Sequence, residues 1–231
     1  KALSHQTLQR ENKAYREHLE ATNRELKLGL DELRADQQAG RHAQLRMLPE
    51  PLNMGDVSCE HKLQPSLMLS GDFLDFMEVD DDRLAFYIAD VSGHGASSAF
   101  VTVLLKNLTY RLKRNFQRGS SDDILKPDLV LGRINNELLA SELDKHLTMF
   151  YGVLTLSTGV LSYSVGGHFP MPVLISKGEA RFFEGRGMPV GLFKEAEYKS
   201  IDVELADDFR LMMFSDGILE IIDEASLNDK E

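Results

Sequence analysis

Two apolar runs flank a cluster of aspartates near the first third of the chain. The runs Phe73–Val79 and Arg83–Ala89 are rich in aromatic and branched residues, which is typical of β-strands. Three consecutive aspartates separate them, and aspartate tolerates the backbone angles that a chain reversal requires. The pattern therefore predicts an antiparallel hairpin that turns about Asp81.

The hairpin register places charged residues opposite each other at its open end. Folding about Asp81 sets Asp72 opposite Asp90, and the apolar pairs Leu74 with Ile88 and Phe76 with Phe86 share that face. Directly opposed Cβ atoms lie roughly 5 Å apart, although a slip of one residue would send one carboxylate to the other face.

Paired carboxylates at this distance need a proton or a cation between them. Like charges so close repel strongly, and hard oxygen ligands suit Mg²⁺ or Mn²⁺. An EF-hand loop beginning at Asp72 would require a glutamate at its twelfth position, which is Arg83. The sequence excludes an EF-hand and predicts a site for hard divalent cations.

The first 43 residues differ from the rest of the chain. They contain no proline, are rich in charged residues and glutamine, and carry Leu19, Leu26 and Leu33 at seven-residue intervals. We expect residues 1–43 to form a linker helix that ends near Gly40 and pairs with a second copy as a coiled coil, giving a homodimer. A single solvated helix is the alternative. The globular domain is expected over residues 44–231.

The remaining chain alternates short strands with two helices. Apolar residues at helical spacing predict helices over Ala96–Gln117 and Pro127–Leu143. Further hairpins are expected around Thr158-Gly159 and Lys177-Gly178, with a final strand over Phe209–Phe214. Many antiparallel strands with two helices between them indicate an α+β sandwich.

Composition narrows the possible functions. The net charge of −11 disfavours nucleic acid as a partner, because phosphate backbones require Lys and Arg. The single cysteine, Cys59, excludes an internal disulfide, and no apolar run is long enough to cross a membrane. The chain begins at Lys1 without a signal-like segment, so we expect a cytoplasmic piece of a longer protein.

Two short motifs place further groups at strand ends. Asp90–Gly95 (DVSGHG) leaves a strand and enters a helix, whose start favours an anion such as phosphate. Phe214–Gly217 (FSDG) puts Asp216 at the end of an apolar strand, although a lone Asp-Gly is usually only a turn. Three aspartates at strand ends would form one cation site if those ends converge.

The globular part, from about Gln44 onward, resembles the SpoIIE/RsbU-type phosphatases of the PPM (PP2C-like) family. Seven motifs in order carry the resemblance: QLRMLP (Gln44–Pro49), SGDFLD (Ser70–Asp75), DVSGHG (Asp90–Gly95), TMFYG (Thr148–Gly152), GGHFP (Gly166–Pro170), GMPVG (Gly187–Gly191) and FSDGILE (Phe214–Glu220). The arrangement also resembles bacterial response regulators of the RssB kind, in which a receiver domain and a helical linker precede this phosphatase.

The resemblance implies two antiparallel sheets flanked by helices, with a centre of two Mg²⁺ or Mn²⁺ ions at one edge. By position, Asp90 would bridge both ions with the Val91 carbonyl as a further ligand, while Asp72 would hold one ion and Asp216 the other. Asp75 would be structural or lie behind the ligands.

Two histidines belong to the matching motifs. His94 is either a general acid for the leaving serine oxygen or merely structural, and both interpretations stay open. His168 is expected to shape a loop beside the site rather than to bind metal.

The implied activity is a metal-dependent protein serine/threonine phosphatase, in which a metal-activated water attacks phosphoserine. The implied substrate is a phosphorylated STAS-type anti-sigma-factor antagonist in a partner-switching pathway. The chain departs from the family at Ser70, usually glycine, and at Leu74, usually tyrosine. It also shows no closing Asp-Asp-x-Thr segment before Glu231, so we expect a truncated C-terminal end, the alternative being a metal site that lacks one ligand.

Two other functions compete with a phosphatase. A pseudophosphatase that sequesters a signalling partner would explain the missing segment, whereas the intact aspartates oppose it. A metal-dependent nucleotidyl cyclase also uses paired aspartates, but no purine-selecting motif is recognisable in the sequence.

Overall fold

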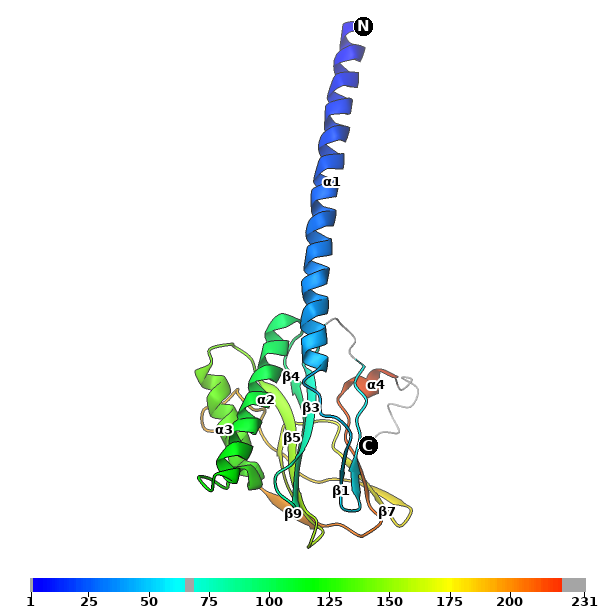
Figure 1. Cartoon of the computed structure of the whole chain (residues 1–231). Helices are drawn as coiled ribbons and strands as arrows, with labels where there is room; N and C mark the ends of the chain where they lie inside the picture. The colour runs from blue at the N-terminus through cyan, green and yellow to red at the C-terminus, as the bar shows by residue number, and fades with distance from the viewer. Residues whose placement is uncertain (1, 65–68, 222–231) are drawn as a thin grey trace. The chain divides into compact units, whose positions relative to one another are not determined.

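The computed structural model describes residues 2–64 and 69–221 (Figure 1). The stretch 222–231, where the truncated end is expected, lies outside the described residues. The chain divides into two compact units, Lys1–Ala43 and Gln44–Glu231. None of the helices in the described ranges combines the length and the apolar character needed to cross a bilayer.

The N-terminal segment is one continuous helix, α1 (Ala2–Leu45). The prediction that it ends near Gly40 was wrong. A glycine inside a helix costs only about 1 kcal/mol relative to alanine, and the first proline after it is Pro49. The helix instead ends in a turn in which the amide of Met47 donates to the carbonyl of Gln44. Its heptad leucines are exposed, and their pairing with a second copy stays a prediction.

Within its described residues, the second unit contains one large and two small antiparallel sheets. The large sheet has the order β3-β4-β5-β6-β9, a second has the order β10-β7-β8, and β1 pairs with β2. The strands are β1 (Leu52–Met54), β2 (Val57–Cys59), β3 (Asp72–Glu78), β4 (Arg83–Val91), β5 (Leu147–Thr155), β6 (Val160–Gly166), β7 (Val173–Ser176), β8 (Glu179–Phe182), β9 (Ile201–Glu204) and β10 (Arg210–Met212). The helices are α2 (Ala96–Gln117), α3 (Pro127–Ala140) and α4 (Gly217–Ile221), with a 3-10 turn at Asp123–Leu125. The predicted α+β sandwich is confirmed.

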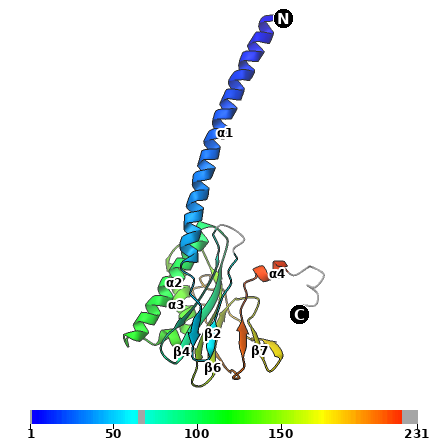
Figure 2. The same cartoon turned by 45° about the vertical axis from the view of Figure 1, so that its right-hand side comes forward.

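Two apolar layers hold this unit together. Helices α2 and α3 lie along one face of the large sheet, and β7 and β10 lie on its other side (Figures 1 and 2). Leu105 of α2 and Ile134 of α3 pack in the first layer, whereas Phe86, Phe150 and Leu174 pack between the sheets. Burying such side chains is the main source of stability, at about 25 cal/mol per Å² of apolar surface.

Helix α2 has the predicted bounds, but α3 ends three residues before the predicted Leu143. Glu142 and Asp144 adopt positive φ angles of 54° and 51°, which a right-handed helix excludes. The segment after Ala140 therefore turns back toward β5.

The predicted hairpin register is confirmed. Asp72 pairs with Asp90, and the apolar pairs beside them face the layer between the sheets. The reversal uses Asp80, Asp81 and Asp82, because the amide of Val79 donates to the carbonyl of Arg83 across them at 2.8 Å.

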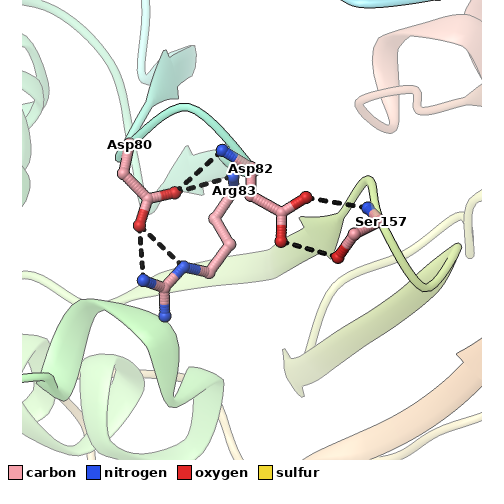
Figure 3. A network of polar contacts seen from close by, with 4 residues as sticks. All are labelled: Asp80, Asp82, Arg83 and Ser157. Atoms are coloured by element: carbon pink, nitrogen blue, oxygen red, sulfur yellow. Dashed lines mark hydrogen bonds and ion pairs between the residues drawn. The ribbon is translucent and has the colours of Figure 1, made fainter.

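Side chains fix this turn from two directions, as Figure 3 shows. Asp80 accepts hydrogen bonds from the amides of Asp82 and Arg83 and pairs with the Arg83 guanidinium, which lowers the pKa of Asp80. Asp82 accepts from the amide and the hydroxyl of Ser157, in the turn between β5 and β6, at 2.8 and 2.7 Å. The guanidinium of Arg83 also lies 4.9 Å from the ring centre of Phe116 on α2. The far end of the hairpin is thus tied to both its neighbouring hairpin and a helix.

Candidate metal centre

Three carboxylates meet at the open end of the β3–β4 hairpin. Asp72 begins β3, Asp90 lies one residue before the end of β4, and Asp216 follows β10 just before α4. One carboxylate oxygen from each residue lies within 4.8 Å of the other two. The hydroxyl of Ser215 donates to Asp72 at 3.1 Å, which connects the segment after β10 to the hairpin. The strand ends therefore converge as the cation hypothesis requires.

The carboxylates open into a pocket of about 290 Å³. Its lining comes from the strand ends and the loop that leads into α2: Leu69, Ser70, Gly71, Asp72, Asp90, Val91, Ser92, Gly93, His94 and Asp216. The structure thus brings every predicted site residue, Val91 and His94 included, to one pocket. Their roles as ligands or as a catalytic group stay predictions.

The electrostatics of the cluster favour a bound cation. Burial, followed by the charges of Asp72 and Asp216, raises the pKa of Asp90 to about 6. Burial also raises the pKa of Asp72, with the Ser215 hydrogen bond acting against it. Among the residues that the structure describes, no Lys, Arg or His forms an ion pair with any of the three. The set of hard oxygen donors with uncompensated charge fits Mg²⁺ or Mn²⁺.

Close backbone packing shapes the ligand side of the pocket. A Cβ atom at Gly71 would lie 2.5 Å from the carbonyl oxygen of Val91, so only glycine allows these two segments to approach. Gly93 and Gly95 adopt positive φ angles of 78° and 82°, which place the start of α2 directly after the pocket. Close packing therefore explains why glycine occurs at position 71, and the positive φ angles explain it at positions 93 and 95.

Hydrogen bonds to Ser92 hold the start of the loop at residues 92–95 in place. The amide of Ser92 donates to the carbonyl of His146, and the carbonyl of Ser92 accepts from the ammonium of Lys145 at 2.9 Å and the hydroxyl of Ser98 at 3.1 Å. The backbone entering α2 is therefore held on both its donor and its acceptor sides.

Two residues of the matching motifs lie outside the carboxylate cluster. Asp75 points to the other face of the sheet, where its buried side chain accepts from the ammonium of Lys106 on α2 at 2.7 Å. The His168 imidazole is buried, and burial lowers its pKa to about 4, so it is neutral at pH 7. The structural position of Asp75 agrees with its expected role away from the ligands.

Sequence reasoning gave no role to Gln44 and missed Lys145. The buried Gln44 side chain donates to the carbonyl of Ser70 at 2.8 Å and to the hydroxyl of Thr102, and it accepts from the amide of Ser70 at 3.2 Å. It thereby fixes the residue two positions before Asp72. Gln44 opens the QLRMLP motif, which was its only signal in the sequence.

Comparison with known proteins decides the family. A family model described as Stage II sporulation protein E (SpoIIE) matches residues 80–230, which is more than half of the chain. The chain belongs to the SpoIIE family.

Two curated relatives of this SpoIIE-family chain are named phosphoserine phosphatases. The chain is 27% identical over 185 residues to the phosphoserine phosphatase RsbP of Bacillus subtilis, covering 78% of this chain and 44% of the relative. It is 26% identical over 174 residues to the phosphoserine phosphatase RsbU of the same organism, covering 74% and 48% respectively. The chain spans less than half the length of either relative.

A solved structure supports the fold. The SiaA-PP2C domain of Pseudomonas aeruginosa aligns with a TM-score of 0.62 and 17% identity, over 79% of this chain and 71% of that one. The SpoIIE-family unit therefore has the PP2C-like fold that the resemblance implied, with the five-stranded and three-stranded antiparallel sheets flanked by helices and the small β1–β2 sheet in addition.

Proposed function

We propose that this SpoIIE-family chain is a metal-dependent protein serine/threonine phosphatase that hydrolyses phosphoserine. The observation that carries the proposal is the convergence of Asp72, Asp90 and Asp216 in one pocket at the sheet edge. The names of the relatives RsbP and RsbU support the same reaction.

Two Mg²⁺ or Mn²⁺ ions would be held by Asp72, Asp90, Asp216 and the Val91 carbonyl. When bound, such ions lower the pKa of water and stabilise charge on phosphoryl oxygens. Burial, and then repulsion from Asp72 and Asp216, raises the pKa of Asp90 in the metal-free chain, and a hard cation would offset both effects by favouring the ionised carboxylate.

The start of α2 and His94 would act on the substrate. Helix α2 begins at Ala96, three residues after the pocket-lining Gly93, so its first amides and the positive end of its dipole would favour a phosphate bound there. The exposed His94 is the candidate general acid for the leaving serine oxygen, and a structural role in the loop is its alternative.

The proposed substrate is a phosphorylated STAS-type anti-sigma-factor antagonist in a cytoplasmic partner-switching pathway. The proposed context is an RssB-like response regulator, in which a receiver domain precedes α1 and α1 pairs with a second copy. The family and the heptad leucines of α1 support this arrangement.

Hydrolysis of p-nitrophenyl phosphate tests the reaction without knowledge of the protein substrate. Turnover that requires Mn²⁺ or Mg²⁺, stops with chelator and returns when metal is restored is expected. A rate equal to the metal-free background under all three conditions would instead favour the pseudophosphatase that binds a partner without catalysis.

A further inference from the structure

Helix α2 differs in charge from the rest of this acidic chain. The whole chain carries 37 acidic and 26 basic residues, yet the stretch from Ala96 to Ser121 contains five basic residues and no acidic one. Two of the five are neutralised, because Lys106 pairs with Asp75 and Arg111 with Glu137. Arg114 and Arg118 are exposed and form no ion pair with any residue in the described ranges.

Three of the five basic residues, Arg111, Arg114 and Arg118, lie along one groove on the exposed side of the helix. This groove has a volume of about 300 Å³ and is lined by Asn107, Tyr110, Arg111, Arg114, Asn115 and Arg118, which we call the α2 row. Tyr110 is 55% exposed, and toward the start of the helix the same spacing continues through Phe100, which is 67% exposed. From Phe100 to Arg118 the helix rises about 27 Å.

We propose that the α2 row binds an acidic surface of the phosphoprotein whose phosphoserine enters the carboxylate pocket. This inference rests on the proposed phosphatase function and adds the chemistry of its substrate. Helix α2 starts at Ala96, two residues after the pocket-lining His94, so one element joins the proposed catalytic end to the docking row. Arginine and tyrosine are also among the side chains most enriched at the energetic centres of protein interfaces.

The shape and charge of the row favour an acidic protein surface over a small anion or a nucleic acid. Five of the six lining residues lie in α2 and the sixth, Arg118, caps its C-terminal end, so the row is a groove across successive turns rather than a closed pocket for a small ion. The net charge of −11 repels the long phosphate backbone of a nucleic acid, whereas an acidic patch of limited length contacts only the row.

Matched phosphoserine peptides test the proposal. One peptide carries four glutamates beyond a spacer of about eight residues, which covers about 27 Å when extended, and its control carries glutamines instead. A third peptide places the glutamates on the other side of the phosphoserine. Binding is measured by fluorescence anisotropy without metal and turnover is measured with Mn²⁺.

Charge reversal in the row is the decisive change. At least one glutamate peptide should bind the wild-type chain more tightly than the glutamine peptide, and R114E/R118E should weaken its binding and its kcat/KM about tenfold. The control K194E/K199E changes net charge equally at two exposed lysines outside α2 and should keep the wild-type preference. Hydrolysis of p-nitrophenyl phosphate should be unchanged in both variants, which also shows that they fold.

Three results would overturn the docking proposal. They are equal binding of glutamate and glutamine peptides, an equal loss in R114E/R118E and K194E/K199E, and tighter binding of a single-stranded oligonucleotide that R114E/R118E abolishes. A wild-type chain that binds the glutamate peptide through the row but hydrolyses no phosphate ester would instead refute the phosphatase function alone.

Discussion

The ammonium of Lys145 lies 2.9 Å from the carbonyl oxygen of Ser92, beneath the loop that enters α2. The same ammonium would lie 2.8 Å from a Cβ atom at Gly93, so the loop and the lysine are in close contact. Lys145 reaches this place from a segment in which Glu142 and Asp144 adopt positive φ angles. The less favourable backbone angles of Glu142 and Asp144 thus occur in the segment that positions Lys145 to hold the loop beside the pocket.

Removing this brace should reduce turnover more than stability. K145M leaves the Ser98 hydrogen bond to Ser92 intact, so we expect a stability loss of only about 1 kcal/mol. Because a small displacement of the loop misplaces the phosphate, kcat/KM for p-nitrophenyl phosphate should fall about tenfold or more. K126M removes an exposed lysine pair with Asp122 and serves as the control. Equal turnover in K145M and K126M would show that the brace is not needed.

Substitution of Asp90 is the most direct test of the cation hypothesis. D90N keeps the shape of the side chain and removes its charge, so turnover should fall by several orders of magnitude, on the order of 10³-fold or more. Mn²⁺ should raise the unfolding temperature of the wild type far more than that of D90N, because only a bound ligand stabilises the folded state. Thermal scans with and without Mn²⁺ decide the matter, and an equal Mn²⁺ response in both proteins would place the metal elsewhere.

The metal-free stability should also depend on pH through Asp90. Its pKa is 3.8 in the unfolded reference and about 6 in the folded chain, so the folded state disfavours the ionised form. The contribution of this group is therefore complete below about pH 4 and is lost as the pH rises through 6. D90N lacks this titration, so its stability relative to wild type should increase across that interval and then level off. Urea unfolding in chelator measures the difference, and a constant difference from pH 4 to 7 would contradict the assigned shift.

The ion pair behind the hairpin should be a stability determinant. Asp75 is 2% exposed, and its partner Lys106 comes from α2. K106M leaves a buried carboxylate without its cation, so we expect a loss of about 3 kcal/mol in the free energy of unfolding. D75N/K106M should recover part of that loss, because both charges are then absent. Urea unfolding in which the double variant is no more stable than K106M would show that the pair is not coupled.

The heptad row of α1 should mediate dimer formation. Leu19, Leu26 and Leu33 are 44%, 61% and 54% exposed on a single helix, which is costly unless a partner covers them. Light scattering should give a dimer for wild type and a monomer for L26E/L33E. L28E alters a leucine that is 63% exposed but lies off the row, and should remain a dimer. A wild-type monomer would end the coiled-coil hypothesis.

The hairpin was predictable because its information is local. Both strands, the three-aspartate turn and the face of each side chain follow from a period of two and one reversal point, which together set Asp72 against Asp90. Helix ends were less predictable. Gly40 is tolerated inside α1 by its strong helix-forming neighbours, and the positive φ angles that end α3 belong to ordinary polar residues.

The three aspartates of the candidate site were predictable, because each lies at the end of an apolar strand. Each aspartate follows or precedes an apolar strand and belongs to a motif with glycine. Gln44 and Lys145 lie 26 and 53 positions from the backbone groups that they hold, and no periodicity links such distant residues. Supporting side chains of this kind become visible only once the chain is folded.

The turn that Asp80, Asp82 and Ser157 fix lies at the opposite end of the hairpin from the carboxylate cluster. Shifting the pairing by one residue would place Asp72 against a neighbour of Asp90 and turn one carboxylate to the helix side of the sheet. A misregistered chain consequently has no complete cation site. If the cluster binds divalent cations as proposed, those cations would bind and stabilise only molecules with the correct register, so metal would raise the yield of folded protein as well as supply its chemistry.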